Sequence, residues 1–137
     1  MKVRRRSNVY PKDLKYTEQH EWVRVDGNQA TVGITYFAQD QLGAIVGLGL
    51  PDEGADVEKG SELADLDSMK TADQIFAPVS GKIIKVNTAL DTQPELLNED
   101  PYGEGWVAVI EMTDPKEAED LMSQEEYEAH VAKEAGE

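Results

Sequence analysis

A turn signal between two β-rich runs constrains the fold of this chain most. Asp-Gly-Asn at positions 26–28 joins residues 21–25 to residues 30–34, and both runs are rich in valine, isoleucine or tryptophan. Such a turn between apolar runs is typical of a tight hairpin, because its residues tolerate the backbone conformations that the reversal requires. We therefore expect an antiparallel hairpin here, preceded by a short extended stretch at 14–17.

Five further short strands are expected after this hairpin. Each combines β-branched or other apolar residues with flanking glycine, proline or aspartate, as strands bounded by turns do. The expected strands cover residues 44–50, 62–67, 72–77, 82–86 and 106–112. Many short strands with little helix favour a flattened antiparallel barrel or sandwich. The predicted fold class is therefore mainly β.

The helices that the sequence predicts are short, and the longest lies near the C-terminus. Residues 35–42 predict one or two helical turns, and residues 94–97 predict a single turn. The amphipathic helix expected at 123–133 begins with Ser123 followed three residues later by Glu126, which is the sequence of a capping box. This helix would add an acidic C-terminal element to the β fold.

The length of 137 residues suits one domain with a modest core. We expect a single domain over 1–137, with its core at about 14–113, a basic N-terminal extension at 1–10 and the acidic helix at about 123–134. No apolar run reaches the roughly 18 residues that cross a membrane. The basic start is not followed by the apolar core of a signal peptide. These features predict a cytoplasmic protein of a bacterium or archaeon, with no membrane partner.

The charge balance is strongly acidic. Thirteen basic and 28 acidic residues leave a formal net charge of −15. Such a surface repels nucleic acid and anionic membranes and favours docking onto basic protein surfaces. We expect protein partners and no nucleic acid.

The sequence shows few features of a catalytic site. The chain has no cysteine, which excludes a cysteine nucleophile, disulfides and cysteine-ligated metals. His20 and His130 are the only histidines, and the sequence shows no metal-ligand spacing around them. Asp65 and Asp67 share one strand face, which is typical of a solvated surface. We predict no catalytic residue and no metal site.

Lys70 is the exception, because of where it falls. Residues 60–81 predict strand, tight turn and strand, with Ser68 to Thr71 as the turn and Lys70 at its tip. An unperturbed lysine, with a pKa of about 10.4, is a poor nucleophile at neutral pH. A Schiff-base enzyme would bury such a lysine, whereas an exposed lysine on a rigid hairpin suits acylation by another enzyme. We interpret Lys70 as the attachment point of a carrier.

Short motifs lie along most of the chain. These are Leu-Lys-Tyr-Thr at 14–17, His-Glu-Trp-Val at 20–23, Val-Gly-Ile-Thr at 32–35, Ala-Gln at 38–39 with Gln-Leu-Gly at 41–43, Ala-Pro-Val-Ser-Gly at 77–81 and Asn-Glu-Asp-Pro-Tyr-Gly-Glu-Gly-Trp at 98–106. With these motifs the sequence resembles the glycine cleavage system H protein family over about residues 14–131. Lys70 falls on the lysine that this family lipoylates.

The resemblance implies a barrel-sandwich hybrid of the lipoyl-domain type and a non-catalytic carrier with lipoate in amide linkage to Lys70. The implied partners are a pyridoxal-phosphate-dependent glycine decarboxylase, an aminomethyltransferase, a dihydrolipoyl dehydrogenase and a lipoate ligase or lipoyl transferase. The lipoyl arm would shuttle an aminomethyl intermediate of glycine decarboxylation. Asp67, Ser68, Met69 and Thr71 would form the hairpin that the ligase recognises.

Departures from the family pattern cluster around the expected arm. Gln74 stands where the family commonly has aspartate, and Phe37 stands where it has histidine. In the family, two acidic residues help to hold the amine of the cargo. One of them matches Glu21, and the other stands at the position that Gln74 occupies here. We therefore name Glu21, Gln74 and Phe37 as candidate contacts of the arm or its cargo.

Losing one carboxylate would weaken the binding of a cationic cargo, so two alternatives stay open. The first is an H-like lipoate-binding protein that carries sulfur intermediates and serves the sulfur-oxidation complex proteins of a heterodisulfide-reductase-like system. The second is an interaction module that has lost its cofactor.

Overall fold

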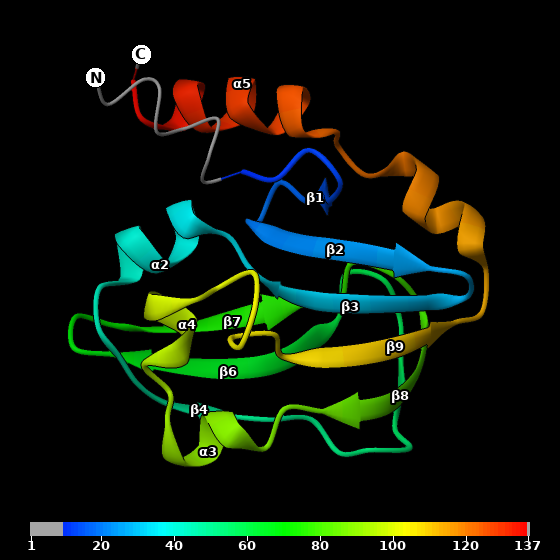
Figure 1. The fold of residues 1–137 in the computed structure, drawn as a ribbon, viewed down its shortest axis with the longest axis horizontal. Helices are drawn as coiled ribbons and strands as arrows, with labels where there is room; N and C mark the ends of the chain where they lie inside the picture. Colours follow the sequence, from blue (N-terminus) through cyan, green and yellow to red (C-terminus); the bar gives the residue numbers. More distant parts are fainter. Residues whose placement is uncertain (1–9, 137) are drawn as a thin grey trace.

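The computed structural model describes residues 10–136, so the predicted basic extension lies outside the described residues except for Tyr10. The chain forms two antiparallel sheets with short helices at one end and a longer helix across one side (Figure 1). The larger sheet has the strand order β1-β2-β3-β9-β8-β5, and the smaller has the order β4-β6-β7. The predicted mainly β sandwich with a C-terminal helix is confirmed.

The larger sheet consists of β1 (Lys15–Tyr16), β2 (Glu21–Asp26), β3 (Gln29–Ile34), β5 (Asp56–Val57), β8 (Gly81–Val86) and β9 (Ala108–Met112). The smaller sheet consists of β4 (Ile45–Gly49), β6 (Glu62–Ser68) and β7 (Ala72–Phe76). The helices are α2 (Tyr36–Leu42), α3 (Ala89–Thr92), α4 (Leu96–Glu99), the 3₁₀ helix η1 (Pro115–Asp120) and α5 (Gln124–Glu134).

The strands and the capped helices lie close to where the sequence predicts them. The β2–β3 hairpin closes with Asp26 opposite Gln29. Thr35 caps α2 by accepting a hydrogen bond from the amide of Ala38. In α5, Ser123 and Glu126 make both bonds of the predicted capping box.

Four elements differ from the predictions. β5 has only two residues and owes its strand character to pairing with β8, so residue alternation within it gave no signal. α3 and η1 lie in segments where no helix was predicted, although Asp114 before Pro115 is a usable helix-start signal. α4 begins two residues later than the single turn predicted at 94–97.

Two apolar clusters hold the molecule together. The main core lies between the sheets and combines Val32 and Ile110 of the larger sheet with Leu66 and Ile75 of the smaller. A second cluster lies beneath α5. It consists of Tyr10, Leu14, Tyr16, Trp22, Tyr127 and Val131. Because α5 covers this cluster, the helix is part of the fold and not an appendage.

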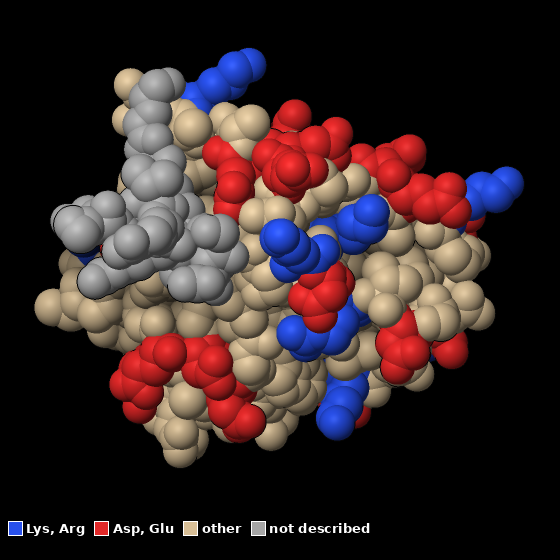
Figure 2. Space-filling model, turned by 45° about the horizontal axis from the view of Figure 1, so that its top comes forward, with Lys and Arg blue, Asp and Glu red and all other residues tan. Residues whose placement is uncertain are grey.

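The described residues contain no helix that is long and apolar enough to cross a membrane. Acidic side chains form several separate groups on the face in Figure 2, and basic side chains lie between them. The strongly negative charge is therefore distributed over this face and not confined to one patch.

The close approach of β8 to β9 gives a stability prediction. A Cβ added at Gly81 would overlap the backbone carbonyl of Glu111, whereas a Cβ added at Gly47 in β4 would meet no atom within 4 Å. We expect Gly81→Ala to lower the free energy of unfolding by about 1–3 kcal/mol through this clash. Gly47→Ala is the matched control and should leave it unchanged or raise it slightly. Urea denaturation of both variants measures the difference, and equal stabilities would contradict the packing described here.

Candidate functional site

The tip of the β6–β7 hairpin is organised by the hydroxyl of Ser68. The two strands pair up to Asp67 opposite Ala72, which leaves the tip between them. The Ser68 hydroxyl oxygen accepts hydrogen bonds from the amides of Lys70 and Thr71, both at 3.1 Å. The Ser68 amide donates to the carbonyl of Thr71 at 2.8 Å. The turn is therefore closed by local bonds, and Lys70 lies exposed at its tip, as predicted.

The tip is also tied to the neighbouring strand. The amide of Met69 donates to the carbonyl of Ala44 at 2.9 Å, while the Met69 side chain is 75% exposed. The alkyl stem of Lys70 runs beside Gly43, where an added Cβ would lie 3.3 Å from the lysine Cε. The root of the Lys70 side chain is thus fixed, and an apolar side chain is displayed beside it.

An open hollow of about 500 Å³ lies between α2, β7 and the end of α5. Leu42 lines this hollow and directly precedes Gly43, beside which the stem of Lys70 runs. The hollow is lined by Gln19, His20, Phe37, Ala38, Gln41, Leu42, Asp73, Glu134 and Ala135.

The candidate contacts Phe37 and Gln74 lie in different places. Phe37 lines the hollow, with its ring centroid 4.6 Å from that of His20. Gln74 lies on the opposite face of β7 from Asp73, and its side-chain amide donates to Glu62 at 3.1 Å. Asp73, the neighbour of Gln74, lines the hollow instead.

Asp73 was not among the residues that the sequence singled out. It pairs with Leu66 and lies two residues before Ile75, and both of these apolar side chains are buried. Strand alternation therefore places Asp73 on the inward face of the sheet, at the end where the core gives way to the hollow. The same alternation, applied to β7 from its sequence, could have identified it.

Glu21 lies at the start of β2 and is buried, with 2% of its surface exposed. One carboxylate oxygen accepts from the hydroxyl of Thr17 at 2.5 Å, and the other accepts from the amide of Phe76 at 3.0 Å. Burial raises the pKa of Glu21, the two donors oppose this, and the charge of Asp73 adds to the increase. Glu21 lines a different hollow from Asp73, together with Tyr16 and Thr17.

Sequence and fold comparisons give the same family. Residues 14–134 match the family described as "Glycine cleavage H-protein". The chain is 50% identical over 125 residues to the glycine cleavage system H protein of Marinobacter nauticus, covering 90% of this chain and 96% of that protein. It is 48% identical over 121 residues to the probable glycine cleavage system H protein of Haloarcula marismortui, covering 88% and 95%.

A solved structure agrees with these sequence matches. The crystal structure of a glycine cleavage system H protein from Mycobacterium marinum superimposes with a TM-score of 0.80 at 34% sequence identity. The match covers 93% of this chain and 99% of that one. Nearly full-length agreement in both sequence and fold shows that the chain belongs to the glycine cleavage H-protein family.

Proposed function

We propose that this chain is the lipoyl carrier of the glycine cleavage system, with lipoate joined through an amide bond to Nζ of Lys70. The observation that carries the proposal is an exposed lysine on a hydrogen-bonded hairpin tip in a chain of this family. When bound, lipoate would supply a cyclic disulfide at the end of a long flexible arm, and this disulfide, reduced as its S–S bond opens, would accept the aminomethyl group derived from glycine. The chain itself provides an anchor and a docking surface and catalyses no step.

The hairpin fits the attachment of such a group. A modifying enzyme must reach the amine, and the exposed side chains of Lys70, Met69 and Thr71 leave it accessible. We propose that a lipoate ligase or lipoyl transferase recognises the side chains of Asp67, Met69 and Thr71 around the lysine. Ser68 contributes through its hydroxyl, which holds the turn that presents them.

The charges near the hollow suit a cationic cargo. An aminomethyl group carries an amine that is protonated at neutral pH, and Asp73 offers a carboxylate at the wall of the hollow. Glu21 is a second carboxyl group, whose pKa the charge of Asp73 helps to raise. The ring of Phe37 offers the cationic amine an aromatic face. We propose that Asp73 takes the principal role in holding the amine, with Glu21 supporting it. A sulfur cargo would need no carboxylate, and the relatives compared above carry glycine cleavage names.

The proposed partners are those of glycine cleavage in the cytoplasm: the pyridoxal-phosphate-dependent glycine decarboxylase, the aminomethyltransferase and the dihydrolipoyl dehydrogenase. The net charge of −15 would speed their association through basic docking faces.

The attachment site can be tested by intact-mass analysis of protein produced with a lipoate ligase. We expect one lipoyl mass shift on the wild-type chain and none on Lys70→Arg, because the guanidinium cannot form the amide. Lys59→Arg is the matched control, since Lys59 is another exposed lysine close to a turn. Lipoylation that persists in Lys70→Arg would refute the assignment.

The role of Asp73 can be tested in the lipoylated, aminomethyl-loaded carrier. We expect Asp73→Asn to shorten the lifetime of the loaded carrier by a factor of about 1.4 to 5, because an exposed ion pair contributes about 0.2–1 kcal/mol. Gln74→Asn, on the other face of the strand, should leave the lifetime unchanged. Release of ammonia over time gives the measurement. Equal lifetimes for wild type and Asp73→Asn would remove Asp73 from the cargo site without affecting the carrier role.

A further inference from the structure

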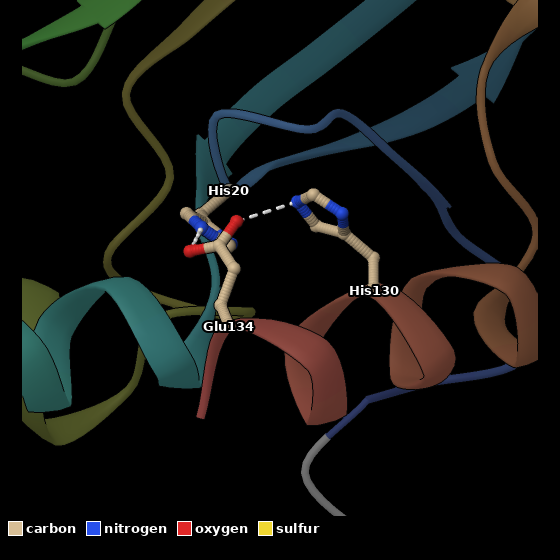
Figure 3. Close-up of side chains that lie close together, drawn as sticks. All are labelled: His20, His130 and Glu134. Atoms are coloured by element: carbon tan, nitrogen blue, oxygen red, sulfur yellow. Dashed lines mark hydrogen bonds and ion pairs between the residues drawn. The ribbon is translucent and has the colours of Figure 1, made fainter. Parts of the chain in front are cut away.

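Folding brings both histidines of the chain together with one carboxylate. His20 lies in the turn before β2, whereas His130 and Glu134 lie one helical turn apart on α5. One potential ligand atom from each residue lies within 4.8 Å of the other two. Figure 3 shows the Glu134 carboxylate between the two imidazole rings. Residues separated by more than a hundred positions thus form one cluster of nitrogen and oxygen donors.

The donor atoms converge on a common space. Nε2 of His20 lies 3.0 Å from one Glu134 oxygen, and Nε2 of His130 lies 2.7 Å from the other. We propose that these three residues form a binding site for a divalent transition-metal ion, with Zn²⁺ as the preferred ion. The ligands would be Nε2 of each histidine and the carboxylate of Glu134. Zinc requires ligand distances of about 2.0–2.2 Å, and the three ligand atoms already lie within 4.8 Å of one another.

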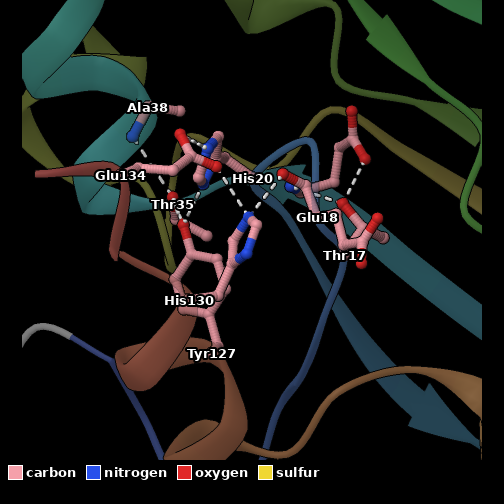
Figure 4. A network of polar contacts seen from close by, with 9 residues as sticks. Thr17, Glu18, His20, Thr35, Ala38, Tyr127, His130 and Glu134 are labelled. Carbon is pink, nitrogen blue, oxygen red and sulfur yellow. Dashed lines mark hydrogen bonds and ion pairs between the residues drawn. The ribbon is translucent and has the colours of Figure 1, made fainter. Parts of the chain in front are cut away.

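A chain of hydroxyl groups supports His20 from behind (Figure 4). Its Nδ1 lies 2.7 Å from the hydroxyl of Tyr127, which lies 2.7 Å from the hydroxyl of Thr35. Metal-binding histidines commonly use their second ring nitrogen in this way, which fixes the ring orientation and the tautomer. Tyr127 is fully buried, so this support is rigid.

The hydroxyl chain can run in either direction, which suits an exchange of a proton for a metal ion. Without metal, the Glu134 carboxylate accepts a hydrogen bond from Nε2–H of His20. Nδ1 of His20 then accepts a hydrogen bond from the Tyr127 hydroxyl, and the oxygen of that hydroxyl accepts one from Thr35. With metal on Nε2, the imidazole proton moves to Nδ1 and is donated to Tyr127, whose hydroxyl then donates to Thr35. In both arrangements the two ring nitrogens of His20 and the hydroxyl of Tyr127 have partners.

The backbone of His20 is held in a conformation that few residues adopt. Its φ angle is +75°, and it is the only non-glycine residue with positive φ among residues 10–136. The amide of His20 donates to the carbonyl of Thr17, and its carbonyl accepts from the amide of Thr35. Uncommon backbone conformations of this kind cluster at functional sites. The conformation aims the His20 ring at α5.

The choice of Zn²⁺ follows from the ligands and their surroundings. Two imidazoles and one carboxylate suit zinc in a three-ligand site that leaves a position for water. The side chains of His20, His130 and Glu134 are 14%, 25% and 41% exposed, so an ion can reach the site from solvent. A bound ion would join the end of α5 to the turn before β2, beside the hollow that His20 and Glu134 also line.

Because the chain has two histidines and no cysteine, the test is unusually clean. Untagged full-length protein is titrated with Co²⁺, whose visible absorption strengthens in tetrahedral protein sites, and Zn²⁺ is then added as a competitor. We expect saturable visible bands that Zn²⁺ removes, and a higher melting temperature with Zn²⁺. His130→Ala and Glu134→Gln should each weaken binding at least about tenfold. Glu125→Gln on the same helix is the matched control and should bind as the wild type does.

Three results would overturn the proposal. The first is wild-type protein with neither visible bands nor a Zn²⁺-dependent change in melting temperature, which would leave Glu134 as a hydrogen-bonding partner of the histidines only. The second is unchanged affinity in His130→Ala, which would place the ion on the acidic surface. Nitrogen NMR of the His20 ring gives a readout on folded wild-type protein: zinc should move the proton from Nε2 to Nδ1, and an unmoved proton would also refute the site. None of these results depends on lipoylation.

Discussion

The register between β6 and β7 is the constraint on which the rest of the site depends. Leu66 and Ile75 point into the core between the sheets, which fixes the faces of both strands. A slip of one residue would turn every side chain of one strand to the other face. Asp73 would then leave the hollow, and Lys70 would no longer lie at the tip that Ser68 closes. Burial of two apolar side chains therefore sets both the position of the anchor and the charge near it.

The second apolar cluster has a similar role at the other wall of the hollow. The ring of Tyr127 stacks on that of Tyr16, with centroids 4.6 Å apart and planes at 8°. This contact holds α5 against β1. As a result, Glu134 lines the hollow and the Tyr127 hydroxyl contacts His20. Tyr16 near the start of the described residues and Tyr127 near their end thus meet through aromatic packing. A helix that appears from its sequence to be an acidic appendage instead completes the site.

The sequence predicted the strands and the lysine because both have local signals. Turn residues and alternation mark the two hairpins, and family motifs extend along almost the whole chain. The arrangement around the lysine could be predicted only in part. Position 74 drew attention because its residue type departs from the family, yet the strand face places Asp73, and not Gln74, toward the hollow. The cluster of His20 with His130 had no sequence signal, because only the packing of α5 brings them together.

The placement of charge suggests how the proposed carrier distinguishes a loaded arm from an empty one. Amide formation removes the positive charge of Lys70, so Asp73 and Glu21 have no electrostatic attraction for the root of the arm. Under the proposed function, an amine on the cargo would restore a positive charge at the far end of the arm. The same two carboxylates would then favour docking of a loaded arm over an empty one, by an interaction that the cargo alone provides. Because Asp73 is exposed, this preference is modest, and the cargo stays available for transfer to the next partner.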